Sequence, residues 1–253
     1  MPVRGAAPQL SLFPEHDEPG SEPGFDVRES ARARRLSIKV FPRGRVEVVV
    51  PKRTRPKEVE LFVNENSEWI KKARESFARE HPPEPFKLPD RIELRGIGQT
   101  ILVRYEHRRN SKIVRFRTGR QLVVLSGHIG DEKLCVKALR RWLSTTAKKE
   151  FEPRLRALSE LTQTPYGQLQ VRAQRTCWGS RSSTGTISLN LCLLFLETQL
   201  VRYLMIHELC HGKHMNHSKS FWRYVGSFEP NYRKLDRELT ECWNRVPSWL
   251  GIY

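Results

Sequence analysis

Leu204-Met205-Ile206-His207-Glu208-Leu209-Cys210-His211 is the stretch that decides the fold of this 253-residue chain. His207 and His211 are four residues apart, so on a helix both imidazole rings leave the same face. Two neutral imidazoles at this spacing can chelate one Zn²⁺ ion. The three apolar residues before His207 indicate that the helix runs through the core. We therefore expect a helix over about residues 198–211 that carries a metal site.

Glu208 is the expected general base of this site. A helical rotation of about 100° separates it from His207, which places its carboxylate beside the metal and not on it. From there the carboxylate can take a proton from a zinc-activated water, which then attacks a carbonyl or a phosphorus. The pattern predicts a zinc-dependent hydrolase.

A third histidine completes the predicted site. His217 lies six residues after His211, past Gly212, which can end the helix and let the chain fold back. Catalytic zinc takes three protein ligands and keeps one open position, so we expect one Zn²⁺ on His207, His211 and His217. The rival third ligands are His214, if the helix continues past Gly212, and the downstream carboxylates Glu229, Asp236, Glu238 and Glu241.

Three further residues are candidate contacts for a substrate or transition state. Residues 186–190 alternate as a strand, and at a sheet edge over the zinc this strand would pair with an extended peptide. Asn190 ends that strand, and Arg181 lies in the glycine-bearing stretch before it. Tyr232 would stabilise an oxyanion if it approaches the metal. Packing within the core is the alternative for Tyr232.

Alternating and helical apolar spacings predict an α+β fold in three parts. Residues 1–30 are rich in Pro, Gly and Glu and are predicted to be a disordered acidic tail. Residues 31–128 form a basic, strand-rich region with a hairpin over 36–50, a helix over 57–79, and two strand pairs. Residues 129–253 are predicted to be a zincin-like catalytic domain, in which helices pack on a small twisted sheet. Its first helix begins at Asp131 and is kinked or divided at Pro153.

Charge is distributed unevenly along the chain, whose net charge is +17. Residues 1–30 hold two basic and six acidic residues, a net −4, so the remaining residues carry +21. Such a body favours anionic partners, and we expect non-specific nucleic-acid binding without base recognition. No segment is apolar enough to span a membrane, so a membrane partner is not expected. Five cysteines without CxxC spacing and no signal peptide favour a reduced, cytoplasmic protein.

A short apolar cluster stands out within the acidic tail: Gln9, Leu10, Ser11, Leu12 and Phe13. It resembles the peptide with which bacterial proteins dock on the DNA sliding clamp. A disordered tail can offer such apolar side chains to a groove, with Gln9 as a polar anchor. A chance apolar cluster, or a segment that folds back on its own domain, is the alternative.

The flanks of the metal helix resemble the YgjP-like branch of the SprT-like/WLM zinc metallopeptidases. Resemblance is densest over residues 172–232, in Trp178-Gly179-Ser180, Ile187-Ser188-Leu189-Asn190, Asn216-His217-Ser218 and Phe221-Trp222. It implies a zincin-like domain with the three histidines on zinc and Glu208 as the base. The family usually reads Arg-Trp-Gly-Ser-Cys where this chain has Cys177-Trp178-Gly179-Ser180-Arg181, so two residue types have changed places.

The sequence therefore predicts a zinc metallopeptidase that cuts peptide bonds. The basic body and the tail cluster suggest that it acts near DNA or the replication clamp. Two other functions stay open. One is a metal-dependent phosphohydrolase that releases pyrophosphate from nucleoside triphosphates, because the same site could attack phosphorus while basic residues hold the phosphates. The other is a DNA- or clamp-bound adaptor with a structural zinc.

Overall fold

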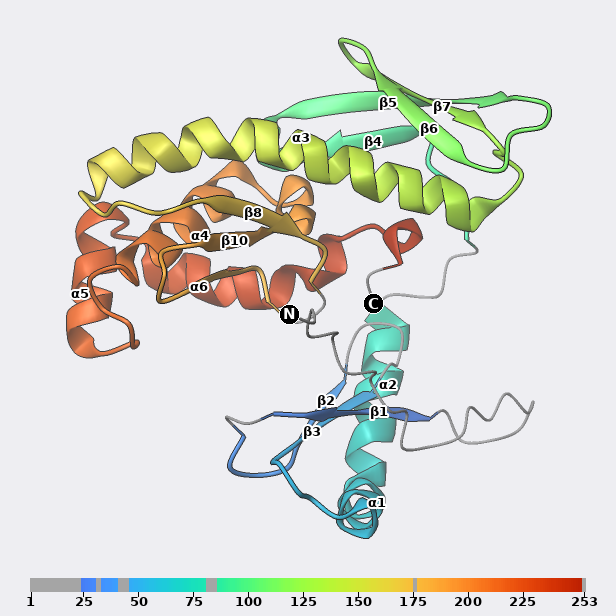
Figure 1. Ribbon diagram of the computed structural model, residues 1–253. Helices are drawn as coiled ribbons and strands as arrows, with labels where there is room; N and C mark the ends of the chain where they lie inside the picture. Colours follow the sequence, from blue (N-terminus) through green and yellow to red (C-terminus); the bar gives the residue numbers. More distant parts are fainter. Residues whose placement is uncertain (1–23, 31–32, 41–45, 81–85, 175–176, 252–253) are drawn as a thin grey trace, which may run out of the picture. The chain divides into compact units, whose positions relative to one another are not determined.

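The computed structural model describes residues 24–30, 33–40, 46–80, 86–174 and 177–251. The chain divides into two compact units, Met1–Glu80 and His81–Tyr253 (Figure 1), which are described separately below. Each unit combines helices with small mixed sheets, so the predicted α+β class is confirmed.

The first unit is built on a three-stranded sheet in the order β1-β3-β2. Its central strand is β3 (Val46–Val50), in which every residue is buried. β2 (Ser37–Val40) pairs antiparallel with β3, which confirms the predicted strand pair, and β1 (Phe25–Glu29) pairs parallel with it. Two helices follow, α1 (Pro56–Glu65) and α2 (Ser67–Glu80), where the sequence predicted a single helix.

Strand β1 corrects the prediction that residues 1–30 are disordered throughout. Phe25 and Val27 pack against the buried valines of β3, so the end of the predicted tail supplies a strand of the core. Arg28 also forms an ion pair of 3.1 Å with Glu47, whose side chain is nearly buried. The sequence pattern did not predict this strand, because it has only two apolar residues, which alternate with charged residues, in a segment of acidic composition.

The second unit begins with a four-stranded sheet in the order β4-β5-β7-β6. The antiparallel pairs are β4 (Arg91–Leu94) with β5 (Gln99–His107), and β6 (Val114–Thr118) with β7 (Leu122–Gly127), as the sequence predicts. One face of this sheet packs on α3 (Glu132–Leu161), a single helix of 30 residues that Asp131 caps through the amide of Leu134. Pro153 lies within α3 and does not divide it.

The four-stranded sheet and the helices after it share one hydrophobic core. Ile92, Leu94 and Leu125 from the sheet belong to the same buried cluster as Trp142 of α3 and Met205 farther along the chain. The compact unit therefore starts near residue 81, whereas the sequence predicted a boundary at residue 128. The difference arises because the apolar face of these strands is covered by α3, which lies beyond the predicted boundary.

A second sheet, in the order β8-β10-β9, supports the region of the predicted metal site. Its central strand β10 (Ile187–Asn190) is buried and pairs parallel with β8 (Leu169–Arg172) and antiparallel with β9 (Gly179–Arg181). Residues 186–190 would pair with a peptide only at a sheet edge, and this condition is not met, because both sides of β10 are occupied and β9 is the edge strand beside α4. Short 3-10 turns and three helices follow: α4 (Thr198–Cys210), α5 (Lys219–Phe228) and α6 (Tyr232–Glu241).

All five cysteines lie within the described residues, and none is paired in a disulfide. Four of them are buried, and Cys177 is half-buried. Among the described helices, none combines the length and the apolar character that a membrane crossing requires.

Candidate metal centre

Helix α4 contains His207 and ends on His211, its C-cap residue. Leu204, Met205 and Ile206 are buried, so the helix runs through the core before it reaches His207. The amide of Gly212 donates to the carbonyl of Leu209 at 2.8 Å and closes the last turn, after which the chain reverses toward α5. Ser218 then caps α5 by accepting a hydrogen bond from the Phe221 amide at 3.3 Å.

This reversal brings His217 back to the face of α4 that His207 and His211 share. The Nε2 atoms of His217 and His207 are 3.0 Å apart. One ligand nitrogen from each of the three rings lies within 4.8 Å of the others. Two nitrogen ligands of a tetrahedral zinc ion at about 2.0–2.1 Å lie about 3.3 Å apart, so this spacing fits a single ion.

Hydrogen bonds at the far side of two rings leave the ligand nitrogens free. The Tyr203 hydroxyl donates to Asp236 Oδ1 at 2.7 Å, so it accepts from His207 Nδ1 at 3.3 Å. His211 Nδ1 lies 3.1 Å from the carbonyl oxygen of His214, which can only accept. Both rings therefore carry their proton on Nδ1, which leaves the lone pair on Nε2 for a metal ion.

Burial keeps the two helical histidines neutral. Burial and the two neighbouring imidazoles lower the pKa of His207 to about 3. Burial is also the main cause of the lowered pKa of His211. Buried Phe221 lines the centre, with its ring stacked on His211 at a centroid distance of 4.5 Å and edge-on to His207 at 5.0 Å. Neutral imidazoles in an apolar setting are suitable ligands for a borderline-soft cation such as zinc.

Glu208 points from the same helix to strand β9 and is 4% exposed. A Cβ atom on Gly179 would lie 3.0 Å from Glu208 Oε1 and 3.1 Å from its Cγ, so the glycine makes room for the carboxylate. Burial raises the pKa of Glu208 to about 8, and the Arg181 guanidinium opposes part of this rise. Glu208 thus lies beside the three histidines with its carboxylate turned toward the edge strand.

The rival third ligands have other roles. His214 contributes its carbonyl oxygen to His211, as described above. Glu229 forms an ion pair with Arg202 at 2.6 Å, Asp236 accepts from Tyr203, and Glu238 pairs with Arg245 at 3.1 Å. Within the described part of the chain, the three histidines are the one group of His, Cys, Asp or Glu side chains whose ligand atoms converge, which leaves Glu241 out as well.

Arg181 lies next to this centre. Its Nη2 donates to the carbonyl of Pro165 at 2.8 Å, while Nη1 is buried without a hydrogen-bond partner. A Cβ atom on Gly212 would lie 2.9 Å from Nη2, so the guanidinium packs against the turn that follows His211. Arg181 is the last residue of strand β9 and Cys177 precedes that strand, so the two exchanged residues lie at opposite ends of an extended segment.

Asn190 does not fit the expectation of a substrate contact. It is fully buried, and its Nδ2 donates to the carbonyls of Gln174 at 2.8 Å and Cys177 at 2.9 Å. Its Oδ1 accepts from the amide of Cys192 at 3.1 Å. Asn190 therefore positions the chain before β9 and has no polar group left for a substrate.

Tyr232 lies beside the centre and not over it. Its ring stacks on Trp222 at 5.3 Å, and its hydroxyl accepts from Arg233 Nε at 3.1 Å. Trp222 in turn stacks on His217 at 5.5 Å. One aromatic ring therefore separates Tyr232 from the nearest of the three histidines.

The sequence reasoning missed Tyr203 and Gly179. Tyr203 precedes His207 by four residues, so helical spacing alone places it one turn below that ring. Asp236 was considered only as a metal ligand, whereas it orients Tyr203. The proximity of Gly179 to Glu208 depends on the packing of β9 on α4 and has no sequence signal beyond the glycine itself.

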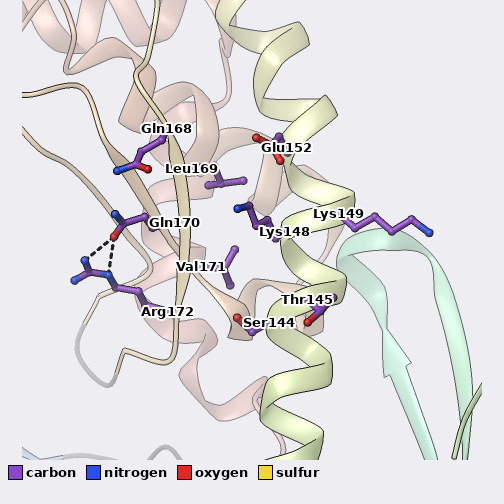
Figure 2. Close-up of a pocket in the computed structure, with 10 residues that line it drawn as sticks. All are labelled: Ser144, Thr145, Lys148, Lys149, Glu152, Gln168, Leu169, Gln170, Val171 and Arg172. Atoms are coloured by element: carbon purple, nitrogen blue, oxygen red, sulfur yellow. Dashed lines mark hydrogen bonds between the residues drawn. The ribbon is translucent and has the colours of Figure 1, made fainter. Parts of the chain in front are cut away.

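A groove of about 680 Å³ runs between α3 and β8, and Figure 2 shows its lining. Gln170 accepts two hydrogen bonds from the guanidinium of Arg172 there, and no histidine of the centre contributes to the lining. Residues 9–13, the predicted clamp-binding cluster, lie outside the described residues, and clamp binding stays a prediction.

One family model and two solved structures are similar to this chain. The family model of the YgjP-like metallopeptidase domain matches residues 34–242. Two solved structures are similar to parts of the chain. The metallopeptidase zymogen abylysin of Pyrococcus abyssi is 30% identical, with a TM-score of 0.33, over 36% of this chain and 92% of its own. The metallopeptidase zymogen jannalysin of Methanocaldococcus jannaschii is 16% identical, with a TM-score of 0.33. This similarity covers 36% of this chain and 93% of jannalysin. A search of curated proteins found no match.

Proposed function

This chain belongs to the YgjP-like metallopeptidase family, and from that premise we propose that it is a zinc peptidase with Glu208 as its general base. Membership implies a divalent metal. One observation supports the assignment of its ligands to His207, His211 and His217: their ligand nitrogens converge while the Nδ1 protons of the first two are fixed on other acceptors.

A bound Zn²⁺ ion would supply Lewis acidity, which polarises the scissile carbonyl and lowers the pKa of a water molecule. The residues of the chain then move the proton. Glu208 accepts it from the attacking water at a carboxylate oxygen and returns it to the leaving amine. The burial that raises the pKa of this carboxyl to about 8 suits such a shuttle, because the group both gains and releases a proton near neutral pH.

Strand β9 is the part of the chain best suited to hold an extended substrate. Among the strands that the structure describes, only β10 pairs with it, and its other edge pairs with none of them. The Trp178 carbonyl accepts from the Asn190 amide at 2.8 Å, and the Ser182 amide donates to the Thr186 carbonyl at 2.9 Å. Residues 178, 180 and 182 therefore face β10, and alternation in the antiparallel ladder turns the amides of Gly179 and Arg181 to the other edge. A peptide paired there would pass beside Glu208, which lies against Gly179.

The decisive experiment compares the wild type with Glu208→Gln. We expect about one zinc per chain in both proteins by elemental analysis. We expect hydrolysis of unfolded or DNA-bound protein substrates to fall by about 10²-fold or more in the variant, because a general base contributes that much. His217→Ala serves as the metal-site control and should lose zinc. Full activity of Glu208→Gln would contradict the proposal.

The same assay separates the other two functions. Release of pyrophosphate from a nucleoside triphosphate panel, without cleavage of any protein, would establish the phosphohydrolase. An inactive wild type that retains zinc, together with a Glu208→Gln variant that keeps full biological function, would establish the adaptor.

We also propose non-specific nucleic-acid binding by the outward face of the four-stranded sheet. Arg104 of β5 and Arg117 of β6 flank Val124 of β7 in register, and both arginines are exposed. Phosphate contacts release counterions, so affinity for duplex DNA should fall steeply as salt rises, with a shallower slope for Arg104→Gln/Arg117→Gln. Affinity that does not change with salt would contradict this surface.

A further inference from the structure

A cavity of about 870 Å³ lies between helices α5 and α6, next to the metal centre. Lys219, Trp222 and Arg223 line it from α5 at helical spacing. Helix α6 completes the lining with Tyr232, Arg233, Asp236 and Arg237. A volume of this order accommodates a few side chains or a small ligand.

Two residues that line the cavity are also in contact with residues of the metal centre. Trp222 lines it and also stacks on His217, with ring centroids 5.5 Å apart. Asp236 lines it and accepts from Tyr203, the hydroxyl that holds His207. A group in the cavity would therefore lie one residue away from the ligand histidines, within reach of a peptide whose scissile bond is at the metal.

The lining carries an excess of positive charge. Its charged groups are four cations and one carboxylate, an excess of three. Asp236 already accepts the Tyr203 hydroxyl, and no ion pair joins a lining cation to a carboxylate among the described residues. Arg233 uses Nε on the Tyr232 hydroxyl, and Arg237 uses Nε on the Arg233 carbonyl at 3.4 Å. Arg233 and Arg237 therefore each keep four terminal N–H groups with which they could bind an oxyanion.

We propose that this cavity is a specificity pocket for acidic side chains of the substrate, on one side of the scissile bond. The inference rests on the proposed peptidase function. Arginine matches a carboxylate with two parallel N–H donors, and lysine adds a point charge. The Trp222 ring already stacks on both His217 and Tyr232, which favours a carboxylate over a nucleobase as the occupant.

The test begins with the cleavage specificity of the zinc-loaded wild type on a proteome-derived peptide library. We expect Glu and Asp to be enriched at one or two positions on a single side of the cleaved bond. Three matched peptides with Glu, Gln or Lys at the preferred position then bind to Glu208→Gln in calorimetry. This variant holds the peptide without cutting it. The Glu peptide should bind about 10- to 100-fold more tightly than the Gln peptide, as expected for hydrogen bonds to a charged group.

Charge reversal locates the preference in this cavity. Arg223→Glu/Arg237→Glu changes one exposed lining residue on each helix, and it should abolish the enrichment of acidic residues or turn it to Lys and Arg. Lys137→Glu/Arg156→Glu is the matched control, because it changes net charge equally at exposed positions of α3 away from the cavity. The control should keep the acidic preference, which excludes a general effect of the net charge.

The outcomes separate the two levels of inference. Cleavage without acidic preference, or a preference that the Arg223→Glu/Arg237→Glu variant retains, overturns the pocket and leaves the peptidase intact. Cleavage of no peptide, with pyrophosphate released from nucleoside triphosphates, overturns both the proposed peptidase and this pocket. An acidic preference that is lost in the lining variant alone supports the proposal.

Discussion

Tyr203 connects the candidate metal centre with helix α6. Its hydroxyl connects Asp236 with His207 and fixes the proton of that imidazole on Nδ1. Because Tyr203 is fully buried, its hydroxyl has no access to water as a substitute partner.

Replacing this hydroxyl should weaken the metal site. We expect Tyr203→Phe to bind zinc about 10- to 100-fold more weakly, the usual loss when a partner of a ligand histidine is removed. Competition with a chromophoric chelator measures the affinity. Tyr105→Phe is the matched control: it removes another tyrosine hydroxyl, which donates to the Pro89 carbonyl at 2.7 Å far along the chain from the histidines. Equal zinc affinity of Tyr203→Phe and wild type would show that the tyrosine is only structural.

The pattern that this chain resembles usually has a cysteine where this chain has Arg181. The guanidinium fills the space between β9 and the turn after His211, and its charge favours the ionised form of Glu208. This chain therefore has a permanent positive charge beside Glu208, the proposed general base, where a cysteine would be neutral when protonated.

At the scale of elements, the close approach of β9 and α4 determines where Glu208 can lie. The approach requires a residue without a side chain at 179, because a Cβ atom there would be 3.0 Å from the carboxylate. The preceding Trp178 anchors the strand from the other side by donating from Nε1 to the Leu239 carbonyl at 2.9 Å and by stacking on Trp243 at 3.9 Å.

Gly179→Ala tests this packing. The added methyl group should displace the Glu208 carboxylate and lower kcat by about 10- to 100-fold, since small misplacements of a catalytic group have effects of this size. Zinc content should stay at the wild-type value because no ligand lies on β9. Ser180→Ala, an exposed neighbour on the other face of the strand, should leave both quantities unchanged. A fully active Gly179→Ala would show that the carboxylate has more room than the packing indicates.

At the scale of the whole molecule, the four-stranded sheet belongs to the unit that holds the metal centre. Arg154 of α3 donates to the carbonyl of Gly96 at 2.6 Å, and Thr198 at the start of α4 donates to the carbonyl of Arg95 at 3.2 Å. These bonds, with the shared core, connect residues before 128 to the catalytic helix. We therefore propose that the catalytic domain needs the sheet.

Two fragments decide where the domain begins. Residues 81–253 should unfold in one cooperative transition and bind zinc, because this fragment retains the complete core. Residues 129–253, the domain predicted from the sequence, should be poorly soluble or unfolded, because the fragment exposes the apolar face that the sheet covers. Circular dichroism and zinc analysis measure both properties. A 129–253 fragment as stable as 81–253 would restore the predicted boundary.

The sequence by itself determined the local chemistry. Helical periodicity placed His207 and Glu208 on α4 and His211 at its C-cap, alternation identified the strand pairs of both units, and Gly212 marked the end of this helix. These features depend on spacings within about one or two turns, which the backbone geometry dictates.

Only the tertiary structure decided which distant segments meet. It made β10 a central strand and β9 the edge, it gave Asn190 a buried structural role, and it brought Asp236 to Tyr203. It also gathered cations from α5 and α6 around one cavity beside His217. Such contacts join residues far apart in the chain, and the choice among them rests on how the whole apolar surface is buried, which no local pattern of residues records.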